Sequence, residues 1–121
     1  MSDQEPICRT RGDGRKEWYK SGKRHRVDGP AIENPNGTKS WFLNGKRHRV
    51  DGPAIEYSNG TKQWFLNNKL HRVDGPACEY ADGAKVWALN DKRHKPIEVF
   101  KAATHEQRIH LLCFYASEFM P

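Results

Sequence analysis

Residues 23–33 read KRHRVDGPAIE, and the same eleven letters return at residues 46–56. A near copy, KLHRVDGPACE, follows at residues 69–79. The recurrence has a constant step of 23 residues, which is marked by four tryptophans: Trp18, Trp41, Trp64 and Trp87. Self-similarity at a fixed period of this length predicts an array of stacked repeats, in which each copy is stable only against its neighbours.

Two kinds of turn signal keep the same step. The first is an Asn-Gly or Asp-Gly pair, found at residues 13–14, 36–37, 59–60 and 82–83. The second is a small polar pair, found at residues 21–22, 44–45, 67–68 and 90–91. Such residues tolerate the positive φ that type I′ turns require. The sequence therefore predicts two turns in every repeat.

Each repeat predicts two short strands between these turns. The first is TKQWFL at residues 61–66, and the second is PACEY at residues 76–80, entered through Asp-Gly-Pro. Because side chains alternate between the faces of a strand, Trp64 and Leu66 are expected on one face and Phe65 on the other. The predicted fold is mainly β: an elongated antiparallel β-meander of about eight short strands built from four repeats, with a C-terminal α-helix, α+β overall.

The composition divides the chain into three parts. Residues 1–12 are polar and are expected to be a mobile N-terminal segment. The repeat array covers residues 13–96. Residues 97–121 contain no glycine and predict a helical cap, with a helix at residues 106–119 and a short helical turn at residues 97–103. Thr104 and Gln107 form a capping-box pattern ahead of that helix, and Pro96 suits a helix start.

The predicted C-terminal helix carries a broad apolar stripe. Its members at helical spacing are Ile109, Leu112, Cys113, Ala116 and either Phe119 or Met120, and Leu111, Phe114 and Tyr115 widen it. This spacing predicts the buried face, and it predicts Cys113 to be a core thiol. The helix either covers the last repeat, whose edge strand would otherwise be open, or pairs part of the stripe with another copy. Both a monomer and a homodimer through this helix stay open.

Charge and cysteine content narrow the functional class. The chain has 21 Lys and Arg against 15 Asp and Glu, a formal charge of +6, which favours an acidic partner. No apolar run approaches the roughly 20 residues that span a bilayer, and the N-terminus lacks the apolar core of a secretory signal. Cys8, Cys78 and Cys113 form no CxxC pair and are expected to be reduced thiols. We therefore expect a cytoplasmic protein without a membrane partner.

The stretch WFLNGKRHRVDGPA at residues 41–54 resembles a known repeat. It keeps the Trp, the Gly four residues later and the His three residues after that, as in the MORN repeat. The chain is more similar still to tandem HRxDGPA repeats of tailed-phage and large-virus proteins, over about 84 of 121 residues (13–96). The resemblance implies a β-meander and a non-enzymatic interaction role, in host cytoplasm if the protein is phage-encoded. The MORN corner differs here, so its ligands are not carried over.

Three residue types recur in step and are expected to be structural. Equivalent histidines lie two strands apart, at about 10 Å, which is too far to share a metal ion whose ligands must approach to about 2.0–2.3 Å. Each histidine is expected to pack on a tryptophan and to bond a backbone carbonyl or the Asp of the corner. The structural set comprises Trp18, Trp41, Trp64, Trp87, His25, His48, His71, Asp28, Asp51 and Asp74.

Basic residues form the candidate partner-binding set. The arginine of each Arg-Val-Asp triplet either pairs with that Asp or with Glu33, Glu56 and Glu79, or points outward in a line of cations. Lysines and arginines that follow the second turn make further columns. The candidate binding residues are Lys23, Arg24, Arg26, Lys46, Arg47, Arg49, Lys69, Arg72 and Arg93.

No catalytic motif appears in the sequence. There is no nucleophile elbow, phosphate loop or HExxH motif, and identical residues in every repeat do not resemble a single asymmetric active site. We expect no enzyme and no cofactor. The expected function is binding of a host protein or nucleoprotein complex, as an anti-defence or anti-CRISPR-like inhibitor suggested by the phage resemblance. The alternatives are nucleic-acid binding through the basic columns and sequestration of a small anionic ligand.

Overall fold

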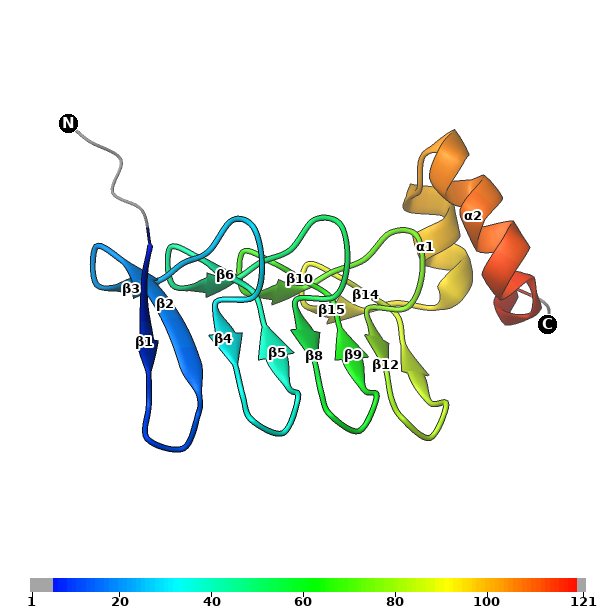
Figure 1. Ribbon diagram of the computed structural model, residues 1–121. Coiled ribbons are helices and arrows are strands. Elements are labelled where there is room, and N and C mark those ends of the chain that lie inside the picture. Colours follow the sequence, from blue (N-terminus) through cyan, green and yellow to red (C-terminus); the bar gives the residue numbers. More distant parts are fainter. Residues whose placement is uncertain (1–5, 120–121) are drawn as a thin grey trace.

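The computed structural model describes residues 6–119 as an elongated array of antiparallel strands with helices at its C-terminal end (Figure 1). This confirms the predicted mainly β meander with a helical C-terminus. The described residues contain 15 strands rather than about eight, because each repeat is divided into more and shorter pieces than expected.

One antiparallel sheet runs the length of the array. Its order is β1-β2-β4-β5-β8-β9-β12-β13, and β3 pairs with β2 beside this path. The strands are β1 (Ile7–Thr10), β2 (Lys16–Lys20), β3 (Lys23–Arg24), β4 (Ile32–Glu33), β5 (Lys39–Ser40), β8 (Ile55–Glu56), β9 (Lys62–Gln63), β12 (Cys78–Glu79) and β13 (Lys85–Val86).

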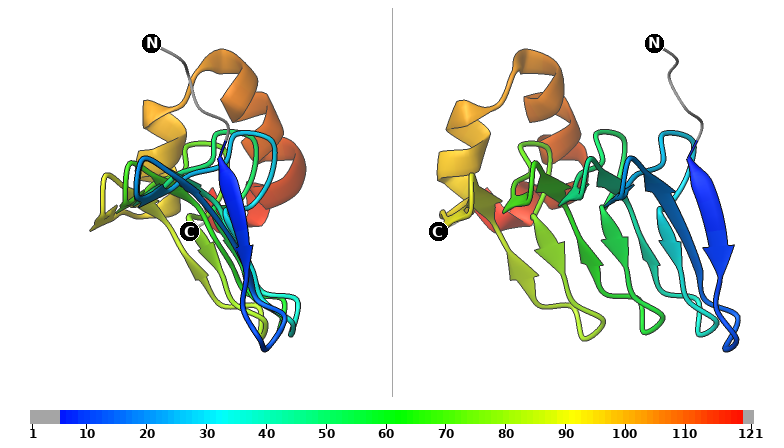
Figure 2. Two further views of the ribbon diagram at one scale, coloured as in Figure 1. Left: turned by 60° about the vertical axis from the view of Figure 1, so that its left-hand side comes forward. Right: turned by 90° about the vertical axis from the view of Figure 1, so that its left-hand side faces the viewer.

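Three two-stranded hairpins form a second row, set at an angle to the main sheet (Figure 2). They are β6 (Phe42–Leu43) with β7 (Lys46–Arg47), β10 (Phe65–Leu66) with β11 (Lys69–Leu70), and β14 (Ala88–Leu89) with β15 (Lys92–Arg93). The strand predicted at residues 61–66 is split at Trp64. Its backbone N–H donates to Ala77 O of the next repeat at 2.8 Å, while its carbonyl accepts from His71 N at 3.0 Å.

The two turns of a repeat have different geometry. Asn44 and Gly45 both have positive φ, at 51° and 80°, which confirms the type I′ prediction for the second turn. The prediction is wrong for the first turn, where Gly37 has a φ of 96° and Asn36 is not in the left-handed region. There the Asn36 side chain instead accepts the N–H of Thr38 at 2.9 Å, so the glycine alone provides the left-handed residue.

A thin core lies between the sheet and the hairpins. Ala31, Ala54 and Ala77 are completely buried, each at the point where its repeat enters the main sheet. Ile55 and Phe65 pack with Ala54 in one cluster. Phe65 is therefore on the inner side, and the array holds together without a thick apolar layer.

The N-terminal expectation needs a correction. Residues 7–10, which were expected to be mobile, form β1 and pair with β2 in antiparallel register, with Cys8 opposite Trp18. The physical reason is that β1 occupies the otherwise open edge of β2. Residues 1–5 of the predicted mobile segment lie outside the described residues.

The C-terminal segment forms α1 (Pro96–Ala102), α2 (His105–Tyr115) and a 3₁₀ turn, η1 (Ala116–Phe119). Pro96 begins α1, and the capping box of Thr104 and Gln107 begins α2, as predicted. The segment packs on the last repeat through Trp87, Val99, Ala103 and Leu111. No helix among residues 6–119 has the length and apolar character needed to cross a bilayer.

The predicted apolar stripe of the helix is only partly buried. Ile109, Leu112 and Ala116 are exposed, and Cys113 is an exposed thiol, so the prediction of a core thiol is wrong. The part of the stripe that packs on the array is the side with Leu111, Tyr115 and Phe119, because that side meets the ring of Trp87. Met120 lies outside the described residues.

Candidate functional site

Arg49 shows how each repeat is joined. Its guanidinium carbon lies 3.9 Å from the centre of the Trp41 ring. Its Nε donates to Asp51 Oδ1 at 3.0 Å, and its Nη1 donates to Pro53 O at 3.1 Å and to Glu56 Oε2 at 2.9 Å. One cation therefore joins an aromatic ring, a loop and the next strand of the sheet.

The same arrangement occurs in three copies. The Arg–Trp distance is 3.9 Å in each, for Arg26 on Trp18, Arg49 on Trp41 and Arg72 on Trp64. The matching carboxylates are Asp28 and Glu33 in the first copy and Asp74 and Glu79 in the third. Of the two arrangements left open for these arginines, the structure shows the paired one and not the outward line of free cations.

A glycine lies under each arginine. A Cβ built on Gly52 would lie 2.8 Å from Cζ of Arg49, and one on Gly75 would lie 2.5 Å from Cζ of Arg72. Both distances are shorter than real Cβ contacts, so any side chain here would displace the guanidinium. The Gly of the Asp-Gly-Pro motif is thus required by the arginine, and its backbone is not in the left-handed region.

The histidines join one repeat to the next. Nδ1 of His25 accepts the backbone N–H of Asn44 at 3.0 Å, and His48 and His71 accept from Asn67 and Asn90 in the same way. The expected partner, a carbonyl or the corner Asp, is therefore wrong for Nδ1. A ring nitrogen can accept a hydrogen bond from a backbone N–H only when it carries no proton. This bond therefore requires the neutral form of histidine.

Burial reinforces the neutral state of two of these rings. It lowers the pKa of His25, and the nearby Lys20 lowers it further. Burial also lowers the pKa of His71. Among residues 6–119, no group of three or more His, Cys, Asp or Glu side chains could hold a metal ion.

The remaining candidate binding residues lie on β3 and on the hairpin row. Lys23 is exposed on β3, and Lys46 and Lys69 are exposed on β7 and β11. Arg24 lies 5.7 Å from the Phe42 ring, and Arg47 lies 4.2 Å from the Phe65 ring. The candidates thus separate into arginines that serve the fold, lysines that face solvent, and Arg93, which is exposed at the last hairpin.

A buried carboxylate at the start of the array was not anticipated. Glu17 is 2% exposed and lies within salt-bridge distance of Arg11, Arg15 and Arg24. Burial alone would raise the pKa of Glu17, but the hydrogen bond from Arg11 and the three positive charges outweigh it and lower the pKa. The equivalent positions in later repeats are Ser40, Gln63 and Val86, so an acidic residue at this place in the first repeat alone was the available signal.

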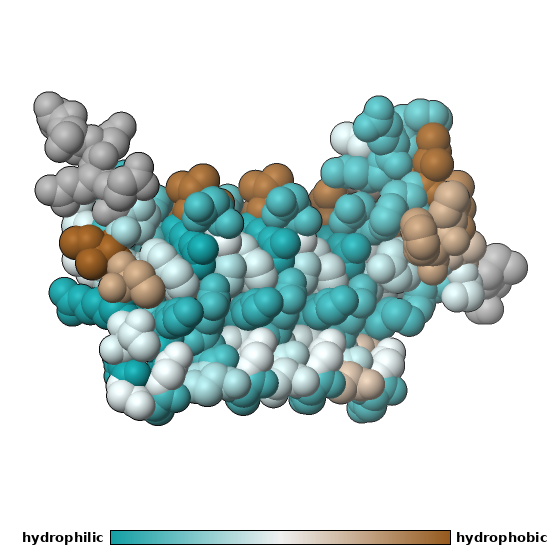
Figure 3. All heavy atoms as spheres, viewed as in Figure 1, coloured by the Kyte–Doolittle hydropathy of each residue, from teal (hydrophilic) through white to brown (hydrophobic). Residues whose placement is uncertain are grey.

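The Arg-Val-Asp-Gly loops project from the array as ridges, which we define as residues 26–29, 49–52 and 72–75. Val27 and Val50 are 80% and 83% exposed at the tops of the first two ridges. Figure 3 shows separate apolar knobs along that edge of the molecule. Exposed valine between charged neighbours was the available signal, and the sequence analysis did not use it.

Two grooves lie between successive ridges. Groove 1, of about 570 Å³, has Val27 and Val50 in its walls and Trp41, Leu43 and His48 in its lining. Groove 2, of about 490 Å³, has Val50 and Val73 in its walls, with Trp64, Leu66 and His71 in the matching places. The predicted sharing of one face by Trp64 and Leu66 is confirmed. The grooves are equivalent because the repeats that make them are equivalent.

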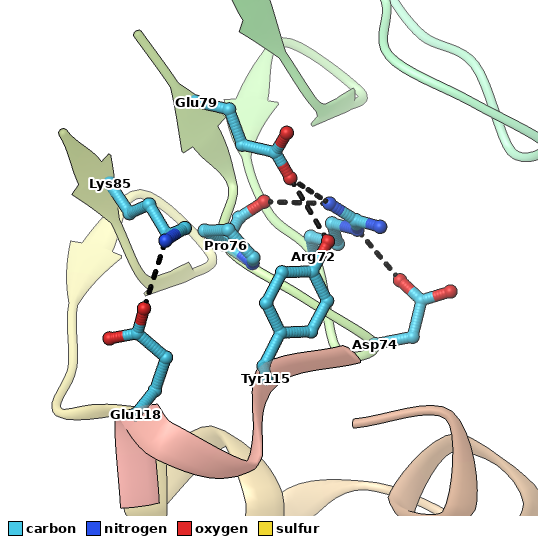
Figure 4. Close-up of polar contacts among 7 residues, drawn as sticks. All are labelled: Arg72, Asp74, Pro76, Glu79, Lys85, Tyr115 and Glu118. Carbon is cyan, nitrogen blue, oxygen red and sulfur yellow. Dashed lines mark hydrogen bonds and ion pairs between the residues drawn. The ribbon is translucent and has the colours of Figure 1, made fainter. Parts of the chain in front are cut away.

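The next equivalent place along the array, beyond the ridge of residues 72–75 and over Trp87, is the third position of this series. It is filled by the C-terminal segment (Figure 4). Tyr115 meets Trp87 edge-on at a ring separation of 5.7 Å, and its hydroxyl donates to Glu79 Oε2 at 3.1 Å. Its ring centre lies 5.9 Å from the guanidinium carbon of Arg72. Burial raises the pKa of Tyr115, so the hydroxyl stays protonated as this bond requires.

Comparison with known proteins gave no match: no family model, no curated protein and no solved structure is similar to the chain. The candidate site therefore rests on the geometry of the ridges and grooves.

Proposed function

We propose that the protein is a non-enzymatic binding module that engages a macromolecular partner through the ridges and grooves. The observation that supports this most is the third position of the series. There, a helical segment already covers a surface that the two preceding repeats leave open, apart from Gln107 of α2 at groove 2. Trp87 is 5% exposed under that segment, whereas Trp41 and Trp64 are only partly buried.

The state of the polar side chains also favours binding over catalysis. The guanidinium of Arg49 is already bonded to Asp51 and Glu56, and Nδ1 of His48 already accepts a backbone N–H. Groups committed to the fold in this way are poor candidates for proton transfer or nucleophilic attack. The same pairing disfavours sequestration of a small anion, since the groove arginines already bind carboxylates.

The identity of the partner stays a prediction. A host protein or nucleoprotein complex, and an inhibitory anti-defence role, follow from the repeat resemblance alone. The exposed ridge valines favour a protein surface, because isolated apolar knobs beside aromatic floors suit burial in a protein interface.

Nucleic-acid binding is the second candidate, and one observation favours it. Lys23, Lys46, Lys69 and Lys92 recur once per repeat, at about 10 Å, on exposed hairpin strands. Within the described residues, none of these four lies in a salt bridge. A line of free cations at this spacing suits a phosphate backbone.

Two double variants separate these functions. Val27→Asp with Val50→Asp places charges on the ridges, and Lys23→Glu with Lys46→Glu reverses the hairpin column. Asn36→Asp with Asn59→Asp adds the same charge as the ridge variant at turns where the chain itself uses Asp13 and Asp82. Partner capture should be measured with each, at low and high salt and after nuclease treatment.

The proposal predicts that the ridge variant loses the captured species and that the turn variant retains it. Capture should also survive nuclease and moderate salt, since a protein interface with aromatic anchors depends little on counterion release. Loss only in the hairpin variant, with a steep salt dependence, would transfer the function to nucleic acid and overturn the proposal.

A further inference from the structure

The main sheet ends at β13, and no strand among residues 6–119 pairs with the outer edge of β13. At the equivalent place in each earlier repeat, a strand of the next repeat is added: β4 lies on β2, β8 on β5 and β12 on β9. After β13 the chain continues into the last hairpin and then into α1. The helices cover the ring of Trp87 but stand above the end of the sheet (Figure 2), so the edge of β13 is open to a further strand.

The backbone of Lys85 points its hydrogen-bonding groups to this open edge. On the inner side of β13, the carbonyl of Ala84 accepts from Tyr80 N and the carbonyl of Val86 accepts from Ala77 N, both at 2.8 Å. Backbone groups of successive residues in a strand point to opposite sides. The N–H and the carbonyl of Lys85 therefore face outward.

Trp87 supplies a third backbone group at the same edge. In the earlier repeats the tryptophan N–H donates to the alanine that begins the next strand: Trp18 to Ala31 at 2.8 Å, Trp41 to Ala54 at 2.7 Å and Trp64 to Ala77 at 2.8 Å. Within the described part of the chain, no residue accepts the backbone N–H of Trp87. The edge of β13 thus offers the same backbone groups with which β9 binds β12.

A slot of about 490 Å³ runs beside this edge, and we call it the edge slot. It is lined by Gly83, Lys85, Val86, Trp87, residues 93–96 and Glu118. None of these residues lines groove 1 or groove 2. The edge slot is therefore a surface separate from the ridges and grooves.

The three strands that bind this kind of edge within the chain define the chemistry of an occupant. They come from Pro-Ala-Ile-Glu at residues 30–33 and 53–56 and from Pro-Ala-Cys-Glu at residues 76–79. The alanine and the residue after it are buried in all three copies. The glutamate lies opposite the lysine of the strand that it joins, as Glu79 does opposite Lys62. An occupant of the same kind would place its glutamate opposite Lys85.

The charge of the edge slot favours an acidic occupant. Lys85, Arg93 and Lys95 all line it, and all three are exposed. Lys85 already attracts one carboxylate, since its Nζ lies 3.0 Å from Oε1 of Glu118 in the C-terminal segment. A glutamate on an added strand would bring a second carboxylate to this group of three cations.

A second copy of the chain offers β1 as a competing occupant. β1 pairs with β2 in the register that β4 has with β5, so it is the equivalent strand of the array. It has Arg9 and Thr10, however, where β4 has Ile32 and Glu33. β1 would therefore bring a further cation to a basic slot and no carboxylate, which favours a segment of another protein.

We propose that the edge of β13 binds an extended acidic segment of a partner protein, of the type Pro-Ala-Ile-Glu, as an added antiparallel strand. The N–H of Trp87 donates to the alanine carbonyl, and the backbone of Lys85 pairs with that of the glutamate. The isoleucine lies opposite Val86. This inference goes beyond the proposed function, because the edge slot shares no residue with the two grooves.

The test uses the full-length protein and a dye-labelled peptide in anisotropy titrations. The peptide copies residues 51–58, DGPAIEYS. In one control peptide the backbone nitrogen of the glutamate is methylated, which removes the N–H that donates to the Lys85 carbonyl. A second control peptide has the same composition in scrambled order.

Two substitutions of one residue separate the backbone of the edge from its side chain. Lys85→Pro removes the outward N–H, and proline is tolerated on an edge strand whose N–H faces solvent. Lys85→Thr removes the same charged side chain and keeps the N–H. The ridge variant Val27→Asp, Val50→Asp is a further control, because its substitutions lie outside the edge slot. Circular dichroism and thermal melting establish that each variant is folded.

The peptide should bind at least about fivefold more tightly than either control peptide. Lys85→Pro should weaken its binding by at least about fivefold, whereas Lys85→Thr should weaken it by less than about threefold. The ridge variant should change it by less than about twofold. By nuclear magnetic resonance, the Lys85 amide of the free protein should exchange its hydrogen faster than the Lys62 amide, and the peptide should slow the exchange at Lys85.

Equal results for the peptide and its methylated control, including no binding of either, would overturn the inference. Equal affinities of Lys85→Pro and Lys85→Thr would do the same. Equal protection of the Lys85 and Lys62 amides in the free monomer would show that the edge is already paired. Self-association of the protein that both Lys85→Pro and Thr10→Pro abolish would assign the edge to β1 of a second copy instead.

Discussion

The guanidinium carbon of Arg49 lies 3.9 Å from the centre of the Trp41 ring. The tryptophan of each of the first three repeats is therefore covered by a paired cation rather than by an apolar layer. This explains how a chain of low mean hydropathy with 13 aromatic residues forms an ordered array. It also removes three arginines from the set of free charges available to a partner.

Replacing Arg49 with lysine should destabilise the array. Lysine cannot stack its head on Trp41 while bonding both Asp51 and Glu56, because it lacks the planar guanidinium. We expect a loss of about 2 kcal/mol in the free energy of unfolding, measured by urea denaturation. The exposed control Lys46→Ala should change it by less than about 0.5 kcal/mol. Equal effects of the two would contradict the structural role of Arg49.

Gly52→Ala should act through the same arginine. The new Cβ meets the guanidinium and displaces it from Trp41. We expect a cost of about 1–2 kcal/mol in the wild-type background and much less in an Arg49→Ala background. A double-mutant cycle by urea denaturation measures this coupling, and additive costs would show that the effect of the new Cβ does not act through Arg49.

The folded array should lose stability in mild acid. The pKa values of His25 and His71 are lowered in the fold, first by burial. Between the ordinary pKa near 6.5 and the lowered folded value, the unfolded chain binds more protons than the folded one. Stability is therefore full above about pH 6.5 and decreases as the pH falls through that value.

The measurement is the free energy of unfolding between about pH 7.5 and 5.5, above the range where most carboxylates titrate. A His25→Asn, His71→Asn variant offers an amide oxygen to the same backbone N–H groups and cannot take up a proton there. Its stability should be lower at neutral pH but flatter across this range. An identical slope in both proteins would place the acid sensitivity elsewhere.

Much of the array followed from the sequence because its signals are local. The period, the turn pairs and the alternation of Trp64 and Phe65 all act within a few residues. The break of the strand at Trp64 was not predictable in this way. It arises because the backbone N–H of Trp64 bonds the next repeat at Ala77, whereas its carbonyl bonds His71 of its own hairpin. The first-turn geometry failed because Asn-Gly suits more than one type of turn.

The site was harder to predict than the fold. The spacing of Ile109, Leu112 and Cys113 is as helical as that of Leu111 and Tyr115, so periodicity alone could not choose the buried face. That choice depends on the ring of Trp87, which lies far away in sequence. The Arg–Trp stacking likewise joins residues eight apart. In an isolated strand such residues are too far apart to touch, so the strand pattern does not predict the contact.

The thiols report on which helix face is buried. Cys8 and Cys113 are exposed, whereas Cys78 is 1% exposed. A thiol reagent added to the native protein should modify two cysteines rapidly, and the third should react only as the protein unfolds. Mass spectrometry of the partly modified protein identifies them. Protection of Cys113 in the native monomer would support the stripe predicted from the sequence.

Tyr115 should fix the C-terminal segment to the array. Tyr115→Phe removes the bond to Glu79 and should cost about 1 kcal/mol. Tyr115→Ala also removes the edge contact with Trp87 and should cost about 3 kcal/mol or more. Urea denaturation followed by tryptophan fluorescence gives both values, with Phe114→Ala as the exposed control. Equal values for Tyr115→Ala and Phe114→Ala would contradict the docking.

The most direct test of the whole account measures stability and partner capture on the same two variants. Arg49→Ala with Arg72→Ala should lower the free energy of unfolding by several kcal/mol, about 4 if the two copies add. Val27→Asp with Val50→Asp should leave it nearly unchanged and abolish capture. An arginine variant that keeps full stability but loses the partner, beside a ridge variant that keeps the partner, would show that the cations bind and the ridges do not.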